Sequence, residues 1–117
     1  MRNDKQNIIV EKSFQFALKV VMYCEHLEEN KKYVVSRQLL KSGTAIGANV
    51  REAQNSESNA DFIHKLKIAA KEAEESEYWL LICKNSSTYP FDNNLLPELH
   101  EIIKIISKII STSKNKQ

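Results

Sequence analysis

Glycine, proline and cysteine are scarce in this 117-residue chain, with two of each, and aromatic residues make up only 8% of it. Folds built from many short strands need frequent glycine- and proline-rich turns, so this scarcity argues against an all-β protein. Two cysteines are also too few for a disulfide-built scaffold. Lys, Glu, Leu, Ile and Ala are abundant instead, and all of these except Ile are strong helix formers. We therefore expect one almost wholly helical domain over residues 1–117.

Long apolar runs are missing as well. None approaches the ~20 residues that a membrane-spanning helix needs, and the opening MRNDKQNI lacks the apolar core of a secretory leader. The sequence therefore predicts a soluble protein of the cytoplasm. Cys24 and Cys83 both fall at apolar helix positions, where reduced, buried thiols are favoured over a disulfide.

Four segments show the 3.6-residue periodicity of amphipathic helices, and turn-forming residues separate them. The expected helices cover about residues 9–29, 34–54, 59–84 and 95–111, with polar leads and tails outside them. Ser58, followed three residues later by Asp61, predicts the cap of the third helix. Because the connections are short, the pattern predicts an all-α fold, an antiparallel up-down-up-down four-helix bundle.

The first and last helices carry wide apolar faces. The first has two adjacent stripes, one of Phe14, Ala17, Val21, Cys24 and Leu27 and one of Phe16, Val20 and Tyr23. Two stripes are expected where a helix touches two neighbours. Leucine and isoleucine side chains cover well over half of the circumference of the last helix. The core of one four-helix bundle does not bury so wide a face. We expect the excess to be buried between subunits.

The second and third helices share a seam that contains polar residues. Ser42 and Asn49 in the second helix and Ser76 in the third recur at the same 4–3 spacing as the apolar residues around them. A buried amide must be hydrogen-bonded, so we expect Asn49 to bond across the seam and to fix its register. Gly43 and Gly47 lie one turn apart and predict a close approach by another helix.

Groups that could do chemistry are sparse. His26, His64 and His100 lie on three different helices without a second ligand one turn away, so no metal site is expected. The sequence has no glycine-rich phosphate loop, no Cys-x-x-Cys and no nucleophile-and-base pattern. We therefore expect neither enzymatic activity nor a bound cofactor.

Charge is unevenly distributed although the net charge is only +2. An up-down bundle brings together the start of the first helix, the turn between the second and third helices, and the end of the last helix. That end would hold nine basic residues against five acidic ones, and the opposite end four basic against nine acidic ones. A ring of copies with parallel axes would join the basic ends into a positive rim that attracts phosphate.

The basic end supplies the candidate binding residues. They are Arg51, Lys65 and Lys67, assisted by Lys12, Lys108, Lys114 and Lys116. They predict salt-dependent, weakly sequence-selective binding of RNA or DNA by a non-enzymatic homo-oligomer. The alternative is a protein-interaction scaffold that contacts no nucleic acid and uses these charges only for solubility.

One set of residues, spread over most of the chain, resembles the pattern of a known protein family. It comprises Phe16-Ala17, Gln38-Leu39-x-x-Ser42, Ile46-x-Ala48-Asn49-Val50-x-Glu52, Asp61-Phe62, Ala69 and the Glu-rich second half of the third helix. In these residues the chain resembles the four-helix-bundle proteins encoded within intervening sequences of bacterial 23S ribosomal RNA genes. Many members have Gly directly after the glutamate, where this chain has Ala53, so we expect the turn slightly later.

The resemblance implies a left-handed up-down bundle that assembles into a homopentameric ring. It also implies kinship with the accessory proteins of diversity-generating retroelements, which are similar basic pentamers that bind nucleic acid and a reverse transcriptase. The resemblance thus supplies expectations of fold, assembly and partners rather than of an activity.

Overall fold

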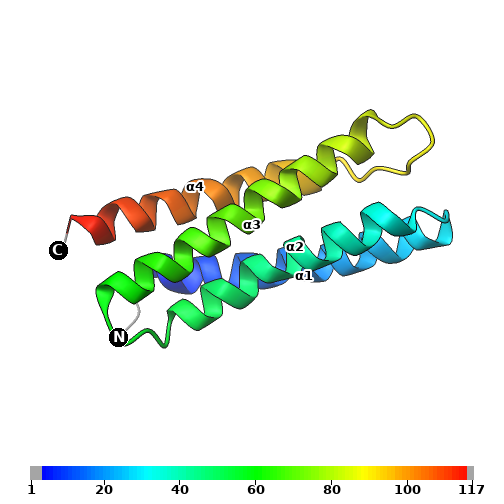
Figure 1. Cartoon of the computed structure of the whole chain (residues 1–117). Coiled ribbons are helices and arrows are strands. Elements are labelled where there is room, and N and C mark those ends of the chain that lie inside the picture. Colours follow the sequence, from blue (N-terminus) through cyan, green and yellow to red (C-terminus); the bar gives the residue numbers. More distant parts are fainter. Residues whose placement is uncertain (1–3, 116–117) are drawn as a thin grey trace.

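The computed structural model describes residues 4–115, with the side chains of residues 4–7 left aside. Its helices are α1 (Asp4–Glu29), α2 (Tyr33–Ala53), α3 (Asn59–Asn85) and α4 (Leu95–Lys114). Within this part of the chain the fold is all-α, with four helices and no strand (Figure 1). The all-α fold class and the expected number of helices are confirmed.

The four helices surround one core. α2 and α4 each pack against both α1 and α3, whereas α1 and α3 occupy opposite corners of the bundle. Figure 1 shows the α2–α3 turn and the end of α4 at one end of the molecule, and the α1–α2 turn and the α3–α4 loop at the other. Each helix contributes fully buried side chains to this core, among them Phe16, Leu39, Leu66 and Leu99.

Two helices are longer than expected. α1 begins at Asp4 rather than near residue 9, and α4 continues to Lys114 rather than ending near residue 111. The extra turn of α4 is held against the start of α3, where the Asn59 side-chain amide donates to the Ser113 carbonyl oxygen at 2.9 Å. α3 begins as expected, with the Ser58 hydroxyl accepting from the Asp61 backbone N–H at 3.0 Å.

The second apolar stripe of α1 lies wholly in the core, whereas the first is divided between core and surface. Phe16, Val20 and Tyr23 are buried, but Phe14 is 46% exposed and Val21 is 39% exposed. The expectation that the Phe14 stripe also packs inside is therefore wrong for these two residues. Cys24 and Leu27 of the same stripe are buried, so only its first part, with Phe14 and Val21, turns away from the core.

The isoleucines of α4 are covered within the chain. Ile102, Ile106 and Ile109 are buried, and Ile103 and Ile105 pack half-buried against the same core. No large apolar side chain of α4 is fully exposed, but Ile103, Ile105 and Ile110 stay partly exposed, and the burial of this helix between subunits remains a prediction. The exposed apolar surface lies mainly on α1 instead, where Leu18 and Met22 join Phe14 and Val21.

A pair of hydroxyl groups joins α2 to α3. Ser42 and Ser76 are both fully buried, and their Oγ atoms lie 2.8 Å apart. The Ser76 Oγ also lies 2.9 Å from the Glu72 carbonyl oxygen. Since each hydroxyl has one hydrogen, Ser76 can donate to this carbonyl while it accepts from Ser42.

Asn49 does not take part in this contact. It is half-buried, and its side-chain amide donates to the Ala45 carbonyl oxygen of its own helix at 2.9 Å. The expectation that Asn49 bonds across the seam is therefore wrong. Its spacing matched the seam, but a long polar side chain at the margin of a helix can reach back to the preceding turn.

Replacing Ser76 with alanine is expected to lower the free energy of unfolding by about 1 kcal/mol, because Ser42 then loses its partner on α3 and keeps only the longer 3.4 Å contact with the Leu39 carbonyl oxygen. Ser42→Ala and Ser76→Ala together should cost less than the sum of the two single changes. Urea denaturation of the four proteins at one concentration measures this coupling. Strictly additive losses would show that the two hydroxyls do not stabilise each other.

α1 and α2 approach closely at the two glycines. A Cβ atom on Gly43 would lie 2.8 Å from Val20 Cγ1, and one on Gly47 would lie 3.3 Å from the Ser13 carbonyl oxygen. Gly43 and Gly47 therefore remove the side chains that would otherwise separate the two helices, as expected from their spacing.

Candidate nucleic-acid interface

Two of the predicted basic residues are ion-paired. Lys12 pairs with Glu101 across the α1–α4 contact, and the Lys65 Nζ lies 3.2 Å from the Glu52 Oε1. The Lys12 ammonium hydrogen-bonds to the Glu101 carboxylate and lowers its pKa. Lys12 and Lys65, two of the expected phosphate contacts, therefore each share their charge with an acid of a neighbouring helix.

Arg51 points to a different side of the bundle from the other candidates. It helps to line a groove between α1 and α2, together with Phe14, Thr44 and Ala48. Its guanidinium carbon lies 5.9 Å from the centre of the Phe14 ring, within the range of a cation–π contact. Arg51 therefore belongs with the exposed apolar side chains of α1 rather than with the lysines of α3 and α4.

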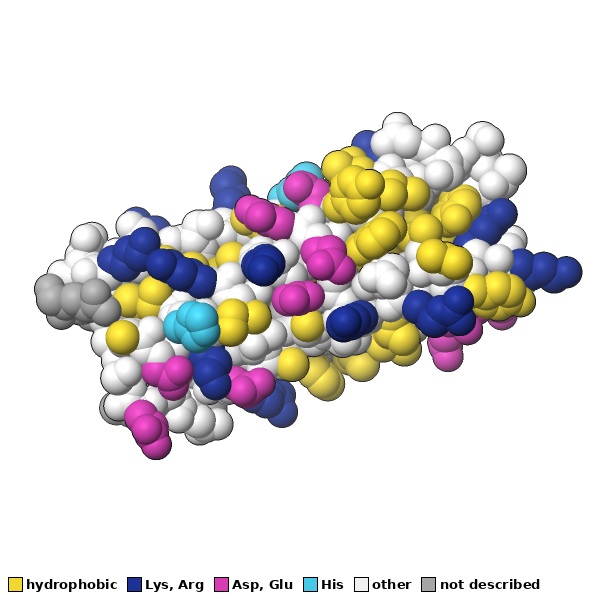
Figure 2. Space-filling model, viewed as in Figure 1, with side chains coloured by type: hydrophobic (Ala, Val, Ile, Leu, Met, Phe, Trp, Pro, Cys, Tyr) yellow, Lys and Arg dark blue, Asp and Glu magenta, His cyan; other side chains and the backbone are white. Residues whose placement is uncertain are grey.

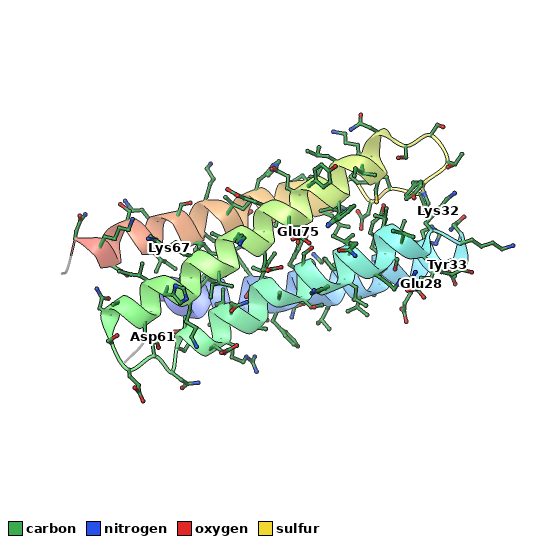
Figure 3. The ribbon with its side chains drawn as sticks, viewed as in Figure 1. Glu28, Lys32, Tyr33, Asp61, Lys67 and Glu75 are labelled. Atoms are coloured by element: carbon green, nitrogen blue, oxygen red, sulfur yellow. The ribbon has the colours of Figure 1, made fainter. Side chains whose placement is uncertain are left out.

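The remaining described candidates lie on α3 and α4. Lys67, Lys108 and Lys114 are exposed, and Figure 3 labels Lys67 on α3. Lys116 lies outside the described residues. Lys71 and Lys104 extend the group, because they lie one turn from Lys67 and Lys108 on the same helix sides.

We call the surface formed by these side chains the lysine face; it consists of Lys67, Lys71, Lys104, Lys108 and Lys114. α3 and α4 run side by side between two contacts, the His100–Glu77 pair and the Asn59–Ser113 hydrogen bond. Figure 2 shows Lys and Arg side chains gathered over this part of α3 and α4. Across residues 8–115, no ion pair joins any member of the lysine face to an acid.

Sequence reasoning missed Lys71 and Lys104 by dividing the charges between the two ends of the bundle. Their i, i+4 spacing to Lys67 and Lys108 was the available signal. The axial charge separation is also weaker than expected, because Lys19 pairs with Glu98 and Lys12 with Glu101. In Figure 2, basic side chains lie at both ends of the visible face. Unpaired positive charge therefore lies along α3 and α4 as well as on α2 and at the opposite end, where, among the described side chains, Arg37, Lys41 and Lys84 are exposed without an ion pair.

Two of the three histidines are ion-paired and both thiols are buried, whereas His64 is exposed. His100 pairs with Glu77, and the His26 Nδ1 lies 3.3 Å from the Glu29 Oε1. Burial raises the pKa of the Cys24 thiol to about 11 and also raises that of Cys83, so both free thiols stay protonated at neutral pH. In the part of the chain that the structure describes, no three His, Cys, Asp or Glu side chains gather into a metal site.

None of the four described helices combines the length and the apolar character that crossing a bilayer requires.

The fold and this surface define a small all-α bundle protein with a basic surface on α3 and α4. The chain belongs to the 23S rRNA-intervening sequence protein family, whose model matches residues 5–111, and the resemblance drawn from the sequence is thereby confirmed. It is also similar to a crystal structure from Bacteroides thetaiotaomicron VPI-5482, described as a protein with unknown function from the S23 ribosomal protein family.

The similarity to that crystal structure extends over nearly the whole of both chains. The two are 42% identical with a TM-score of 0.85, and the match covers 92% of this chain and 98% of the other. No curated protein matches the chain. These two comparisons show the family and the fold, and neither of them assigns a function.

Proposed function

We propose that this protein is a non-enzymatic homo-oligomer that binds the phosphate backbone of RNA or DNA through the lysine face. The proposal includes the antiparallel, left-handed course of the four helices and a pentameric ring, which the family resemblance implies. It places the protein in the cytoplasm, where bacterial RNA and DNA are found. By analogy with the retroelement accessory proteins, a reverse transcriptase is a further partner to test.

The observation that carries the proposal is the unpaired charge of the lysine face. Its five exposed ammonium groups have no acidic partner among the described side chains, whereas Lys12, Lys19 and Lys65 are all paired. Lysines attract phosphate as point charges and read no base edges. The face also has no exposed aromatic side chain on which a base could stack. Binding should therefore follow charge and salt rather than sequence.

The names of the relatives decide which nucleic acid to test first. The family is named for an intervening sequence in 23S rRNA, and the similar structure is described as a member of an S23 ribosomal protein family. Structured RNA is thus the first ligand, and duplex DNA of equal length is the comparison.

A protein-interaction scaffold is the second candidate function. It is favoured by the exposed apolar side chains of α1, Phe14, Leu18, Val21 and Met22. Solvent-exposed clusters of this kind mark protein contact sites. The two functions make different demands, since only the first requires the lysine face.

The test is a titration with labelled RNA and DNA at about 50 and 200 mM salt. Lys104→Gln with Lys108→Gln should weaken binding at low salt and reduce the salt slope by about 1 for each phosphate that is no longer neutralised. A matched control, Lys31→Asn with Lys84→Gln, removes two exposed charges elsewhere and should bind more strongly than the lysine-face variant. Absence of binding at low salt, or equally weakened binding in both variants, would contradict the proposal.

A further inference from the structure

An exposed aromatic side chain lies on the same side of α3 as two members of the lysine face. Lys67, Lys71 and Tyr78 follow one another at steps of four and seven residues, which places them on one stripe of the helix. Tyr78 is 59% exposed. The other aromatic side chains that the structure describes as exposed, Phe14 and Tyr33, belong to α1 and α2. Tyr78 is therefore the exposed ring that continues the lysine face.

The Tyr78 ring packs against Trp79. The two ring centres lie 5.2 Å apart with an angle of 71° between the ring planes, an edge-to-face arrangement that favours one ring orientation. Trp79 is anchored in turn, because it packs partly buried against the core and its indole N–H donates to the Glu75 Oε2 at 3.3 Å. Tyr78 is therefore an exposed ring on a rigid support.

Three glutamates lie close to Tyr78 along α3, and two of them have partners. Glu75 accepts from the Trp79 indole, and Glu77 pairs with His100 of α4. Glu74 is exposed, and among the described side chains it has no ion pair. Figure 2 shows apolar side chains gathered over the second half of α3, with acidic side chains beside them. The stripe thus leads from two cations, past one unpaired acid, to an aromatic ring.

Cations in line with an exposed aromatic ring are the combination with which proteins hold single-stranded nucleic acid. The ammonium groups attract phosphates, and the ring stacks on a base that is not already paired inside a duplex. From Lys71 to Tyr78 the helix rises by ~10 Å, which a lysine side chain and one nucleotide span together. An apolar protein surface laid on this stripe would leave Lys67 and Lys71 without a counter-charge, whereas a nucleotide brings its own phosphates.

We infer that Tyr78 stacks on an unpaired base of a nucleic acid whose phosphates contact Lys67 and Lys71; this rests on the nucleic-acid binding of the proposed function. Tyr78 then adds affinity only for segments with unpaired bases, such as loops and bulges. Because every base has a flat face, stacking accepts all of them, and sequence selectivity stays weak.

The test compares a short single-stranded uridine RNA with an RNA duplex of equal length, both at low salt. Tyr78→Leu keeps an apolar side chain but removes the ring. It should weaken binding of the single strand by about fivefold or more and leave duplex binding nearly unchanged. Tyr78→Phe keeps the ring and should bind like the wild type. Tyr33→Leu removes another exposed tyrosine and, as the matched control, should also bind like the wild type.

Trp79 gives a second readout, because it is the only tryptophan of the chain and its ring packs against Tyr78. The single strand should change the fluorescence of Trp79, and the duplex should not. Glu74→Gln should tighten binding of the single strand, since it removes the unpaired acid between Lys71 and Tyr78.

Three results would overturn the inference: a Tyr78→Leu protein that binds the single strand like the wild type, equal losses for single strand and duplex, or Trp79 fluorescence that the single strand leaves unchanged. A Tyr78→Leu protein with altered sedimentation but unaltered RNA affinity would assign the tyrosine to a protein contact instead. A wild type that binds neither RNA at low salt would contradict the proposed function itself. Duplex binding without any effect of Tyr78 would contradict this inference alone.

Discussion

Replacing Gly43 with leucine is expected to destabilise the fold by about 3 kcal/mol or more, which is a large part of the 5–15 kcal/mol available to a domain. Even a Cβ atom at this position would lie 2.8 Å from Val20 Cγ1 and 3.0 Å from its Cγ2. Val20 is fully buried, and its branched side chain has few other rotamers. α1 and α2 must therefore separate, and removing glycine from the helix regains only about 1 kcal/mol.

Thermal and urea denaturation at a fixed protein concentration measure this destabilisation, since assembly would otherwise change the apparent stability. Ala48→Leu is the matched control, because Ala48 is an exposed residue of the same helix and its replacement should change stability by less than about 0.5 kcal/mol. Val20→Ala in the Gly43→Leu background should recover part of the stability by making room. A Gly43→Leu protein as stable as the wild type would show that the two helices are not in close contact.

Replacing Phe16 with alanine is expected to cost about 3–5 kcal/mol, and replacing Phe14 with alanine less than about 1 kcal/mol. Phe16 is 1% exposed within the core, so its removal leaves a cavity. Phe14 is 46% exposed, and its contact within the chain includes the Arg51 guanidinium, which is worth about 0.5–1 kcal/mol at an exposed site.

The same denaturation measurements on the two alanine variants check this difference. Dilute protein is needed, because assembly of the proposed homo-oligomer would add to the apparent contribution of any exposed residue that it covers. Equal destabilisation would contradict the assignment of Phe16 to the core and of Phe14 to the surface. A destabilisation by Phe14→Ala that grows with protein concentration would show that Phe14 is buried between copies.

Much of the fold could be predicted from local sequence. Ser58 with Asp61 identified the start of α3, and the Gly43–Gly47 spacing identified the close contact of α2, because both signals act within one or two turns. The choice between the Phe14 and Phe16 stripes could not be made in this way. The two stripes are neighbours on the same helix, and only the positions of α2 and α4 decide which one is covered.

The candidate site was less predictable for a similar reason. Lys12 and Glu101 are 89 positions apart, and no local pattern shows that they meet. Lys71 and Lys104 carried a usable signal in their spacing to Lys67 and Lys108, but the sequence did not show that α3 and α4 place both pairs together. For Asn49 the helical periodicity was read correctly, but the partner of its side chain was not. Its amide donates to the Ala45 carbonyl oxygen one turn earlier in the same helix.

The contact between α1 and α4 has a consequence for biosynthesis. α1 is synthesised before α4 and packs against it, and α4 supplies Leu95, Leu99, Ile102 and Ile106 to the core. A nascent chain that has completed α1, α2 and α3 therefore keeps one side of its interior open to water until α4 has been translated. Apolar surface exposed in this way makes an unfinished chain prone to aggregation.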